Sequence, residues 1–483
     1  MHEAIRNTDK VGFVYLLAWW LDIDLPLLSE DKSSTLRNLL AAASGRGVEI
    51  RAMVWKQVFN GETNEGSVAF INSLKTGRAV LDDYTWMRGT ALVASHHQKV
   101  LLVKTRQGLV GFCGGIDINA DRIMSDQKKS PGSPYHDVHC KIEAPSVYDL
   151  LNVFKQRWFS YGNVKTGLSL DNMVYIPEKV PPAQGEQYVR IARTFNFVGK
   201  RGSCQANRSI RSTLMNSIEK ARRFIYIEDQ YMINLEAARL LAKVTGRVQH
   251  LTILVAHFRL SDNPQIWDWQ AQFVNELMMG PKAMSTVRIF VRTSPTNSLE
   301  GAEFVNETPL LEPGKVLYRA SPLGRHAYIH AKTWIIDDEL AVIGSANLDN
   351  RGWSGDNQAN ACIFDAPASS KKPSFAQRLR MRLWSEHLGV PESQVIDGIG
   401  SADLWTDRKR APQANIAVWG EKLEGVPDLP TSQKVLAVGN VLSGTPGTPS
   451  GFVHGYADLS ADNLKICPIE TPRAPGDTPD WTF

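Results

Sequence analysis

SHHQKVLLV (residues 95–103) and YIHAKTWII (residues 328–336) are two similar stretches in this chain of 483 residues, and its predicted fold follows from them. Each stretch carries a histidine, a lysine two positions later and a following apolar run; the pairs are His97 with Lys99 and His330 with Lys332. Residues two apart in a β-strand project from the same face, so each stretch predicts an imidazole beside an ammonium on one strand. Burying a lysine without a partner is costly, and such a pair therefore suits a pocket that receives an anion.

The segments around these two stretches repeat in the same order, as expected of an internal duplication. The matched segments are a buried strand (11–20 and 224–232), a turn (GGIDI, 114–118, and GSANL, 344–348), a polar-to-apolar segment (136–146 and 357–367) and the end of an amphipathic helix (153–158 and 378–384). One match would be unremarkable. Five in one order, counting the two opening stretches, indicate two copies of one unit.

Strands and helices alternate in both copies. The expected elements are a strand, helix and strand in the first copy (11–20, 34–44, 47–55) and a helix, strand, helix and strand in the second (210–223, 224–232, 236–244, 248–256). This order predicts two α/β domains, each with a largely parallel sheet, related by pseudo-twofold symmetry. We place the first at residues 1–190, the second at 191–400, and an irregular Gly- and Pro-rich C-terminal segment at 401–483.

Composition narrows the class of protein. With 43% hydrophobic and 22% charged residues the chain is globular, which excludes global disorder. Its 54 basic and 50 acidic side chains leave a formal charge of +4, which is too even a balance for a dedicated nucleic-acid binder. The five cysteines are scattered and odd in number, so no disulfide framework is expected. The longest apolar run, residues 11–21, is half as long as a membrane span, so we expect a soluble protein. The run also lacks a basic leader, so we expect no signal peptide. We expect the protein to be a monomer.

Two histidine–lysine pairs brought together would surround one phosphoryl group with two imidazoles and two ammoniums. One histidine would attack phosphorus to form a phosphohistidine, and the other would protonate the leaving oxygen and then activate water. This chemistry needs no metal and no cofactor.

A metal site in HDVHC would use His136, His139 and Cys140, but alternate strand residues face opposite sides, so these three do not easily converge. Glu228 and Asp229 end an apolar strand at the expected pocket mouth, where catalysis and fold support both stay open.

The pattern H-x-K-x-x-x-x-D, complete in the second copy and with Lys104 in place of the final aspartate in the first, resembles the phospholipase D superfamily over residues 5–390. The second copy matches in full, through His330, Lys332, Asp337, Ser345 and Asn347. The first copy matches through HHQK and GGID, with Asp117 where the second copy has Asn347. Accessory segments such as FIYIEDQY and LRMRLWSEHLG resemble the branch that hydrolyses phosphatidyl lipids. The resemblance implies two phospholipase D-like domains and a phospholipase D that releases phosphatidic acid and a head-group alcohol, with transfer to other alcohols as a side activity.

Two departures from the family's pattern bear on the chemistry. Lys104 stands where the family has an aspartate that supports the local fold. The family's catalytic histidines are each oriented by an acidic residue on a later strand, and by position these partners are Asp137 in the first half and Gln358 in the second, with Asp356 as a substitute. A neutral amide stabilises an imidazolium poorly. We therefore expect His97, with Asp137 behind it, to be the nucleophile and the other histidine to be the general acid and base.

Four residues that flank the motifs are expected at the lipid head group: Arg122, Arg325, Arg351 and Trp353. The expected partner is a phospholipid membrane surface rather than nucleic acid, and the protein would be cytoplasmic or leave the cell by a leaderless route. A secreted effector that attacks lipids would also need an immunity protein in the cell that makes it. Two alternatives stay open, namely a nuclease of the same superfamily and a catalytically impaired lipid-binding protein, which Lys104 and Gln358 favour.

Overall fold

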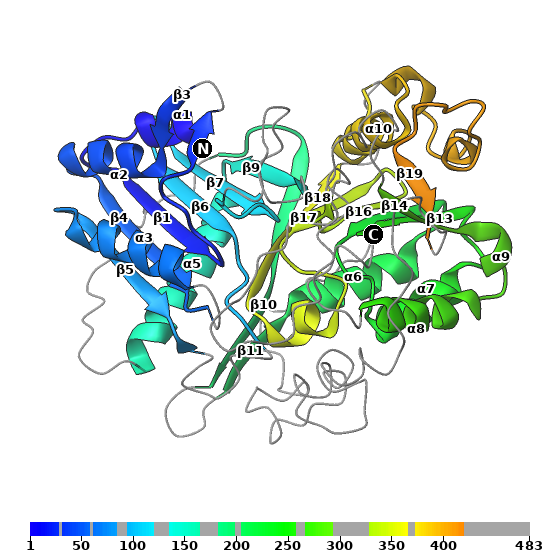
Figure 1. The fold of residues 1–483 in the computed structure, drawn as a ribbon, viewed down its shortest axis with the longest axis horizontal. Coiled ribbons are helices and arrows are strands. Elements are labelled where there is room, and N and C mark those ends of the chain that lie inside the picture. The colour runs from blue at the N-terminus through cyan, green and yellow to red at the C-terminus, as the bar shows by residue number, and fades with distance from the viewer. Residues whose placement is uncertain are drawn as a thin grey trace, which may run out of the picture.

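The computed structural model describes residues 1–28, 31–57, 61–84, 94–119, 135–164, 182–198, 204–256, 266–292, 328–365 and 372–419. Two large β-sheets with helices on their faces form the body, so the predicted α/β class is confirmed. Figure 1 shows the sheet of the N-terminal half on the left and the sheet of the second half running from the centre to the right.

The first sheet has six strands in the order β5-β4-β1-β6-β7-β9. These strands are β1 (Phe13–Ala18), β4 (Glu49–Trp55), β5 (Gly77–Asp82), β6 (Val100–Lys104), β7 (Leu109–Gly114) and β9 (His139–Glu143). The helices of this half are α1 (His2–Arg6), α2 (Leu36–Gly45), α3 (Glu62–Ser73) and α5 (Val147–Val164), and a small hairpin joins β2 (Pro26–Leu28) to β3 (Asp31–Thr35). Strand, helix and strand over residues 11–55 follow the predicted order.

The second sheet has nine strands in the order β11-β10-β18-β17-β16-β12-β13-β14-β19. These strands are β10 (Gln187–Val198), β11 (Cys204–Arg208), β12 (Phe224–Asp229), β13 (His250–Val255), β14 (Val287–Arg292), β16 (Thr333–Ile336), β17 (Leu340–Gly344), β18 (Gln358–Asp365) and β19 (Ile416–Val418). The helices are α6 (Ser209–Lys220), α7 (Leu235–Val244), α8 (Ile266–Met278), α9 (Ala283–Thr286) and α10 (Phe375–Leu388). A two-stranded pair, β8 (Tyr135–His136) with β15 (Tyr328–Ile329), connects the halves.

The strand order of the first sheet recurs in the second, where β14-β13-β12-β16-β17-β18 corresponds to β5-β4-β1-β6-β7-β9. Strand directions also correspond, since the first three strands of each series are parallel and the next three antiparallel. The prediction of largely parallel sheets is therefore wrong. Short turns join β6 to β7 and β16 to β17, and a short turn pairs its two strands antiparallel, whereas parallel pairing needs a long crossover.

Alternate residues of the central strands contribute to hydrophobic cores on both faces of each sheet. In β1, Val14 packs with α2 and α3, whereas Tyr15 packs with α5. In β12, Ile225 packs with α6, α7 and α8, whereas Phe224 packs with α10. These alternations follow from the period of two in a strand. Among the described helices, none combines the length and apolar character needed to cross a membrane.

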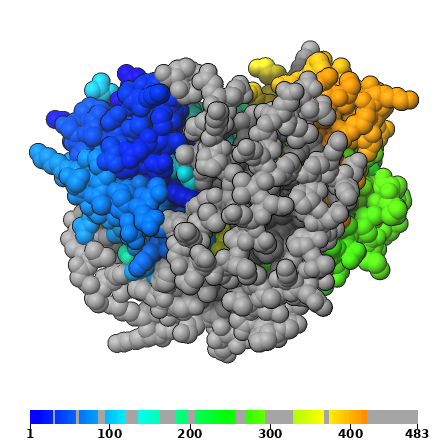
Figure 2. All heavy atoms as spheres, in the orientation of Figure 1, coloured from blue at the N-terminus to red at the C-terminus, as the bar shows by residue number. Residues whose placement is uncertain are grey.

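One hydrophobic core is shared by the two halves. Cys113 and Ile142, on β7 and β9, belong to the same buried cluster as Ile343 and Ala361, on β17 and β18. Figure 2 shows the first half, in blue, on one side of this face of the molecule and the second half, in green and orange, on the other. Strand ends from both halves are therefore held close to one another by buried contacts.

The predicted domain boundaries differ from the limits of the sheets. The boundary between residues 190 and 191 falls inside β10, which pairs with β18. The irregular segment also begins later than residue 401, because β19 pairs with β14 and Trp405 is buried in the core beside α10. Elements of three or four residues, such as β19, are too short to show a periodic pattern. The remainder of that predicted segment, from residue 420 on, lies outside the described residues.

Candidate active site

Each histidine–lysine pair lies in an extended segment that leads into a strand, one before β6 and one before β16. The prediction placed both pairs within the strands themselves. The difference arises because the two histidines form backbone hydrogen bonds with the opposite half of the chain instead of with a sheet neighbour. His97 N–H donates to the carbonyl of Asn357 (3.0 Å), and His330 N–H donates to that of His136 (2.8 Å). These two bonds bring the loops that carry the histidines to the place where the halves meet.

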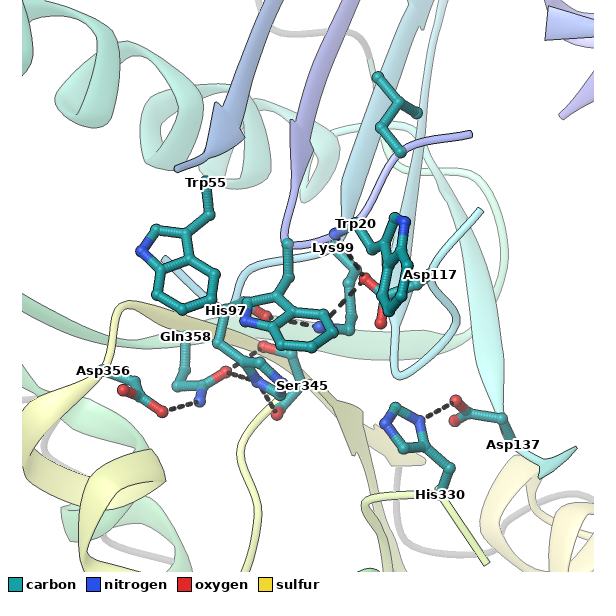
Figure 3. A network of polar contacts seen from close by, with 12 residues as sticks. Trp20, Trp55, His97, Lys99, Asp117, Asp137, His330, Ser345, Asp356 and Gln358 are labelled. Carbon is teal, nitrogen blue, oxygen red and sulfur yellow. Dashed lines mark hydrogen bonds and ion pairs between the residues drawn. The ribbon is translucent and has the colours of Figure 1, made fainter. Parts of the chain in front are cut away.

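His97 is oriented by two acceptors from the second half (Figure 3). Its Nδ1 lies 3.1 Å from the carbonyl oxygen of Ser345 and 3.1 Å from Oε1 of Gln358. A backbone carbonyl can only accept, so Nδ1 carries the proton and Nε2 keeps its lone pair. Burial and the charges of Lys99 and Lys332 hold the pKa of His97 well below its usual value, although Gln358 opposes this shift. His97 is therefore a neutral imidazole with its proton on Nδ1, which is the form that can act as a nucleophile through Nε2.

Gln358 is itself held in one orientation. Its Nε2 donates to Asp356 (3.3 Å), and its Oε1 accepts from the hydroxyl of Ser345 (2.7 Å). Asp356 does not substitute for Gln358 at the imidazole, because its other oxygen accepts the N–H of Ser95 (2.7 Å). The carboxylate therefore acts on His97 only through the amide between them.

His330 has a carboxylate partner, and that partner is Asp137. The distance from His330 Nδ1 to Asp137 Oδ2 is 2.6 Å, and both side chains are at most 5% exposed. The expectation that Asp137 lies behind His97 is therefore wrong, and the partners are exchanged between the halves. Gly115 makes this position of Asp137 accessible, because a Cβ atom there would come within 2.1 Å of the carboxylate. A larger residue at this position would displace the carboxylate.

The two lysines are almost completely buried, with exposed fractions of 4% for Lys99 and 1% for Lys332. Lys99 Nζ lies 3.3 Å from Asp117 and also donates to the carbonyl of His97 (3.2 Å). Lys332 Nζ donates to Gln230 Oε1 (3.1 Å) and to the carbonyl of His330. Each ammonium thus donates to the backbone carbonyl of the histidine two positions before it.

Two further predicted residues, Asp337 and Ser345, have contacts that fit structural support. Asp337 accepts the N–H groups of residues 222, 223 and 224 at 2.7 to 2.8 Å, which ties the turn after β16 to the start of β12. Ser345 anchors Gln358, as described above. Asn347 is 5% exposed and its Oδ1 has no hydrogen-bond partner within the described part of the chain. Lys104, which stands where the second copy has Asp337, lies at the end of β6.

The predicted head-group residues have different positions. Arg351 bonds Asp356 (3.1 Å) and contributes to the positive field at His97. Trp353 is 1% exposed and lies in the hydrophobic core, 6.5 Å from the ring of Trp334, so its predicted role in substrate binding is wrong. Trp353 was predicted only because it flanks a motif, and its side chain packs inward. Arg122 and Arg325 lie outside the described residues.

The predicted site missed an aromatic pair next to His97. The indole of Trp19 lies edge-on to the His97 ring at 5.8 Å and 5.5 Å from Lys99 Nζ, and it stacks on Trp55 at 5.7 Å. Both tryptophans stand at the carboxyl ends of parallel strands, and Figure 3 shows Trp55 above Gln358. The carboxyl ends of parallel strands commonly border a binding site, which was the available signal in the sequence.

The alternative metal site in HDVHC is not assembled as the sequence motif suggested. His136 points to Glu228 and Glu386, whereas Cys140 Sγ contacts the carbonyl of Cys113 (3.1 Å). Asp229 supports the fold, because its carboxylate accepts backbone N–H groups of residues 231, 232 and 348. Glu228, in contrast, joins a network of charged side chains that includes His136.

Comparison with known families gives two matches. A model described as "Phospholipase D" matches residues 120–240, and one described as "Cardiolipin synthase, PLD-like domain" matches residues 214–380. Among curated relatives, phospholipase D alpha 2 of rice (Oryza sativa subsp. japonica) is 24% identical, and phospholipase D alpha 1 of tobacco (Nicotiana tabacum) is 22% identical. Both alignments cover 80% of this chain and 63% of the relative, so the chain spans less than two thirds of these proteins.

A solved structure also resembles the whole chain. The crystal structure of phosphatidylserine synthase from Haemophilus influenzae superposes with a TM-score of 0.54 at 12% identity, covering 92% of this chain and 90% of that chain. At this identity the likeness concerns the fold alone. It shows that the two sheets and their connection belong to a known architecture.

Proposed function

Because this chain belongs to the phospholipase D superfamily, we propose that it is a phosphodiesterase that hydrolyses glycerophospholipids to phosphatidic acid and a head-group alcohol. The observation that carries the proposal is the unequal pairing of the two histidines. His97 faces neutral acceptors, Gln358 and the carbonyl of Ser345, whereas His330 faces the carboxylate of Asp137. One imidazole is thereby suited to attack and the other to hold a proton.

In the first step, Nε2 of His97 attacks phosphorus with its lone pair and forms a P–N bond. The bond from phosphorus to the head-group oxygen breaks, and His330, as an imidazolium, transfers its Nε2 proton to that oxygen. Asp137 stabilises the imidazolium before the transfer and fixes the orientation of the ring. The products of this step are the free alcohol and a phosphohistidine on His97.

In the second step, His330 is neutral and accepts a proton from water as the water oxygen attacks phosphorus. The P–N bond breaks, phosphatidic acid leaves, and His97 regains its lone pair. An alcohol that replaces water gives a new phosphatidyl ester by the same route. Lys99 and Lys332, both buried, stabilise the negative charge on the phosphoryl oxygens in each step, where exclusion of water strengthens the interaction.

The test is a panel of vesicles, each containing one phospholipid class, incubated with the protein in the presence of ethanol and analysed by mass spectrometry. We expect phosphatidic acid and phosphatidylethanol from at least one lipid. The His97→Ala variant should form neither, and a phosphorus–nitrogen adduct should be trapped on His97 in the wild type by rapid acid-free quenching. Cleavage of plasmid DNA without lipid turnover would instead identify a nuclease, and vesicle binding without any product would identify a lipid-binding protein.

A further inference from the structure

Five charged or polar side chains behind His330 form a closed ring of hydrogen bonds. Arg292 Nη1 contacts Glu386 Oε1 (2.9 Å), which contacts His136 Nδ1 (3.1 Å). His136 Nε2 contacts Glu228 Oε2 (2.8 Å), whose other oxygen contacts His387 Nε2 (2.9 Å). The ring closes between His387 Nδ1 and Arg292 Nη1 (2.5 Å). Its members come from β8, β12, β14 and α10, and therefore from both halves of the chain.

The ring touches the general acid through the backbone of His136. The carbonyl of His136 accepts the N–H groups of His330 (2.8 Å) and Ala331 (3.1 Å). The next residue, Asp137, is the carboxylate that orients the His330 ring. Both the main chain and the side-chain partner of His330 are thus attached to the segment that the ring holds.

The protons of the ring can be assigned from its donors. A guanidinium only donates, so Nδ1 of His387 accepts from Arg292 and its Nε2–H donates to Glu228. His136 has a carboxylate at each nitrogen and donates from both, which makes it an imidazolium. Burial opposes this charge, but Glu228 and Glu386 outweigh burial and raise the pKa of His136 to about 9. The two cations, Arg292 and His136, then balance the two anions, Glu228 and Glu386. His387 is neutral.

The same assignment disfavours a metal ion. One ring nitrogen each of His136 and His387 and one Glu228 oxygen lie within 4.8 Å of one another, which is close enough for a shared metal ion. Metal binding by Nε2 of His387 would move its proton to Nδ1, where it would face the Arg292 N–H groups at 2.5 Å. Two donors cannot share that contact, so the ring is complete with protons alone.

We propose that His136 is a positioning residue for the reaction, an imidazolium that clamps the segment carrying Asp137 onto the second half and so aligns His330 for proton transfer. This inference rests on the proposed function, in which His330 is the general acid. Glu228 and Glu386 hold His136 from two different elements, β12 and α10. Loss of the imidazolium would leave Glu228, which is 0% exposed, without its cation and would release the β8 segment from both elements.

The test is a double-mutant cycle with His136→Gln and Asp137→Asn, measured on vesicles of a lipid that the wild type hydrolyses. We expect His136→Gln to lower kcat by about 10- to 100-fold, since a displacement of about 1 Å at a catalytic group has effects of this order. In the Asp137→Asn background the same change should have little further effect. Glu386→Gln, whose side chain is 45% exposed, should fold normally and give a smaller loss in the same direction. Asp403→Asn, which removes an exposed ion pair to Arg288 on β14, is the matched control and should not change kcat.

A spectroscopic measurement separates this inference from the proposed function. In protein labelled with ¹⁵N-histidine, the His330 Nδ1–H bonded to Asp137 should give a low-field proton resonance that shifts or broadens in His136→Gln and Glu386→Gln but not in Asp403→Asn. An unchanged resonance, or additive losses in the cycle, would overturn the clamp. Stoichiometric zinc in the wild type that is lost in His136→Gln would overturn it in favour of a metal site. If the wild type hydrolyses no lipid, the proposed function fails while the resonance still tests the clamp.

Discussion

Replacing Asp137 with asparagine tests which histidine is the general acid. The substitution keeps the size of the side chain but removes the charge that lies 2.6 Å from His330 Nδ1. Both groups are nearly inaccessible to water, with side-chain exposures of 4% and 5%, so solvent does not replace the lost interaction. The imidazolium that must protonate the leaving oxygen is therefore destabilised, and kcat should fall.

The size of the loss has two bounds. A hydrogen bond to a charged partner contributes ~3 kcal/mol at most, which corresponds to a factor of about 10² in rate. An Asp→Asn change behind a catalytic histidine can also favour the wrong tautomer, and in serine proteases the combined effect is ~10⁴. We therefore expect a decrease in kcat of about 10²- to 10⁴-fold for a natural phospholipid.

The assay compares two leaving groups on the same phosphatidyl moiety. Ethanolamine or choline leaves as a basic alkoxide and needs the acid, whereas p-nitrophenol leaves readily without a proton. With the nitrophenyl ester, Asp137→Asn should retain a rapid burst of nitrophenol equal to the enzyme concentration, followed by slow turnover, since His330 is still needed to activate water. Equal loss of the first step with both leaving groups would refute the assignment of His330 as the acid.

Two further predictions follow from the same contacts. Gln358→Glu places a carboxylate at His97, which should raise the pKa of this histidine. The neutral nucleophile is then lost at a higher pH as the pH falls, so the acid limb of the kcat/KM profile should move to higher pH; an unchanged acid limb would contradict a neutral nucleophile at His97. Asp337→Ala removes the acceptor of three backbone N–H groups and places alanine at a positive φ of 57°. The free energy of unfolding, measured by denaturant titration, should therefore fall by ~2–4 kcal/mol. Asp337→Asn should be less destabilised, because asparagine tolerates this conformation.

Patterns within one segment were enough to predict the main strands and helices and to single out the two histidine–lysine pairs. The apolar runs of β1 and β12 and the two H-x-K sequences are local, and the structure places both pairs at the junction of the halves. The partners of the histidines depend on which half each loop meets. His97 reaches Gln358 across 261 positions of sequence and His330 reaches Asp137 across 193, and spacing along one half points to the opposite pairing.

The sequence-based prediction also failed where a residue type commonly serves either in a core or in a site. Trp353 stands in a motif and is a core residue, because its neighbours on β16 and α6 leave an apolar space that the sequence does not display. His136 and Glu228 were each noted, but their contact needs β8 to pair with β15 beside β12. A network assembled from four distant segments has no signature in any one of them.

The exchange of partners gives a physical reason for a duplicated site to react in one direction. Two identical halves would present two equivalent histidines, and each would compete for the same proton. Here, Gln358 and the Ser345 carbonyl leave His97 neutral with its proton on Nδ1, while Asp137 favours the charged form of His330. Gly115 and Ser345, which occupy matching positions, follow the same division: the glycine makes room for the carboxylate, and the serine hydroxyl holds the amide. In the proposed mechanism, a few side chains at equivalent places in the two copies therefore separate the nucleophile from the acid.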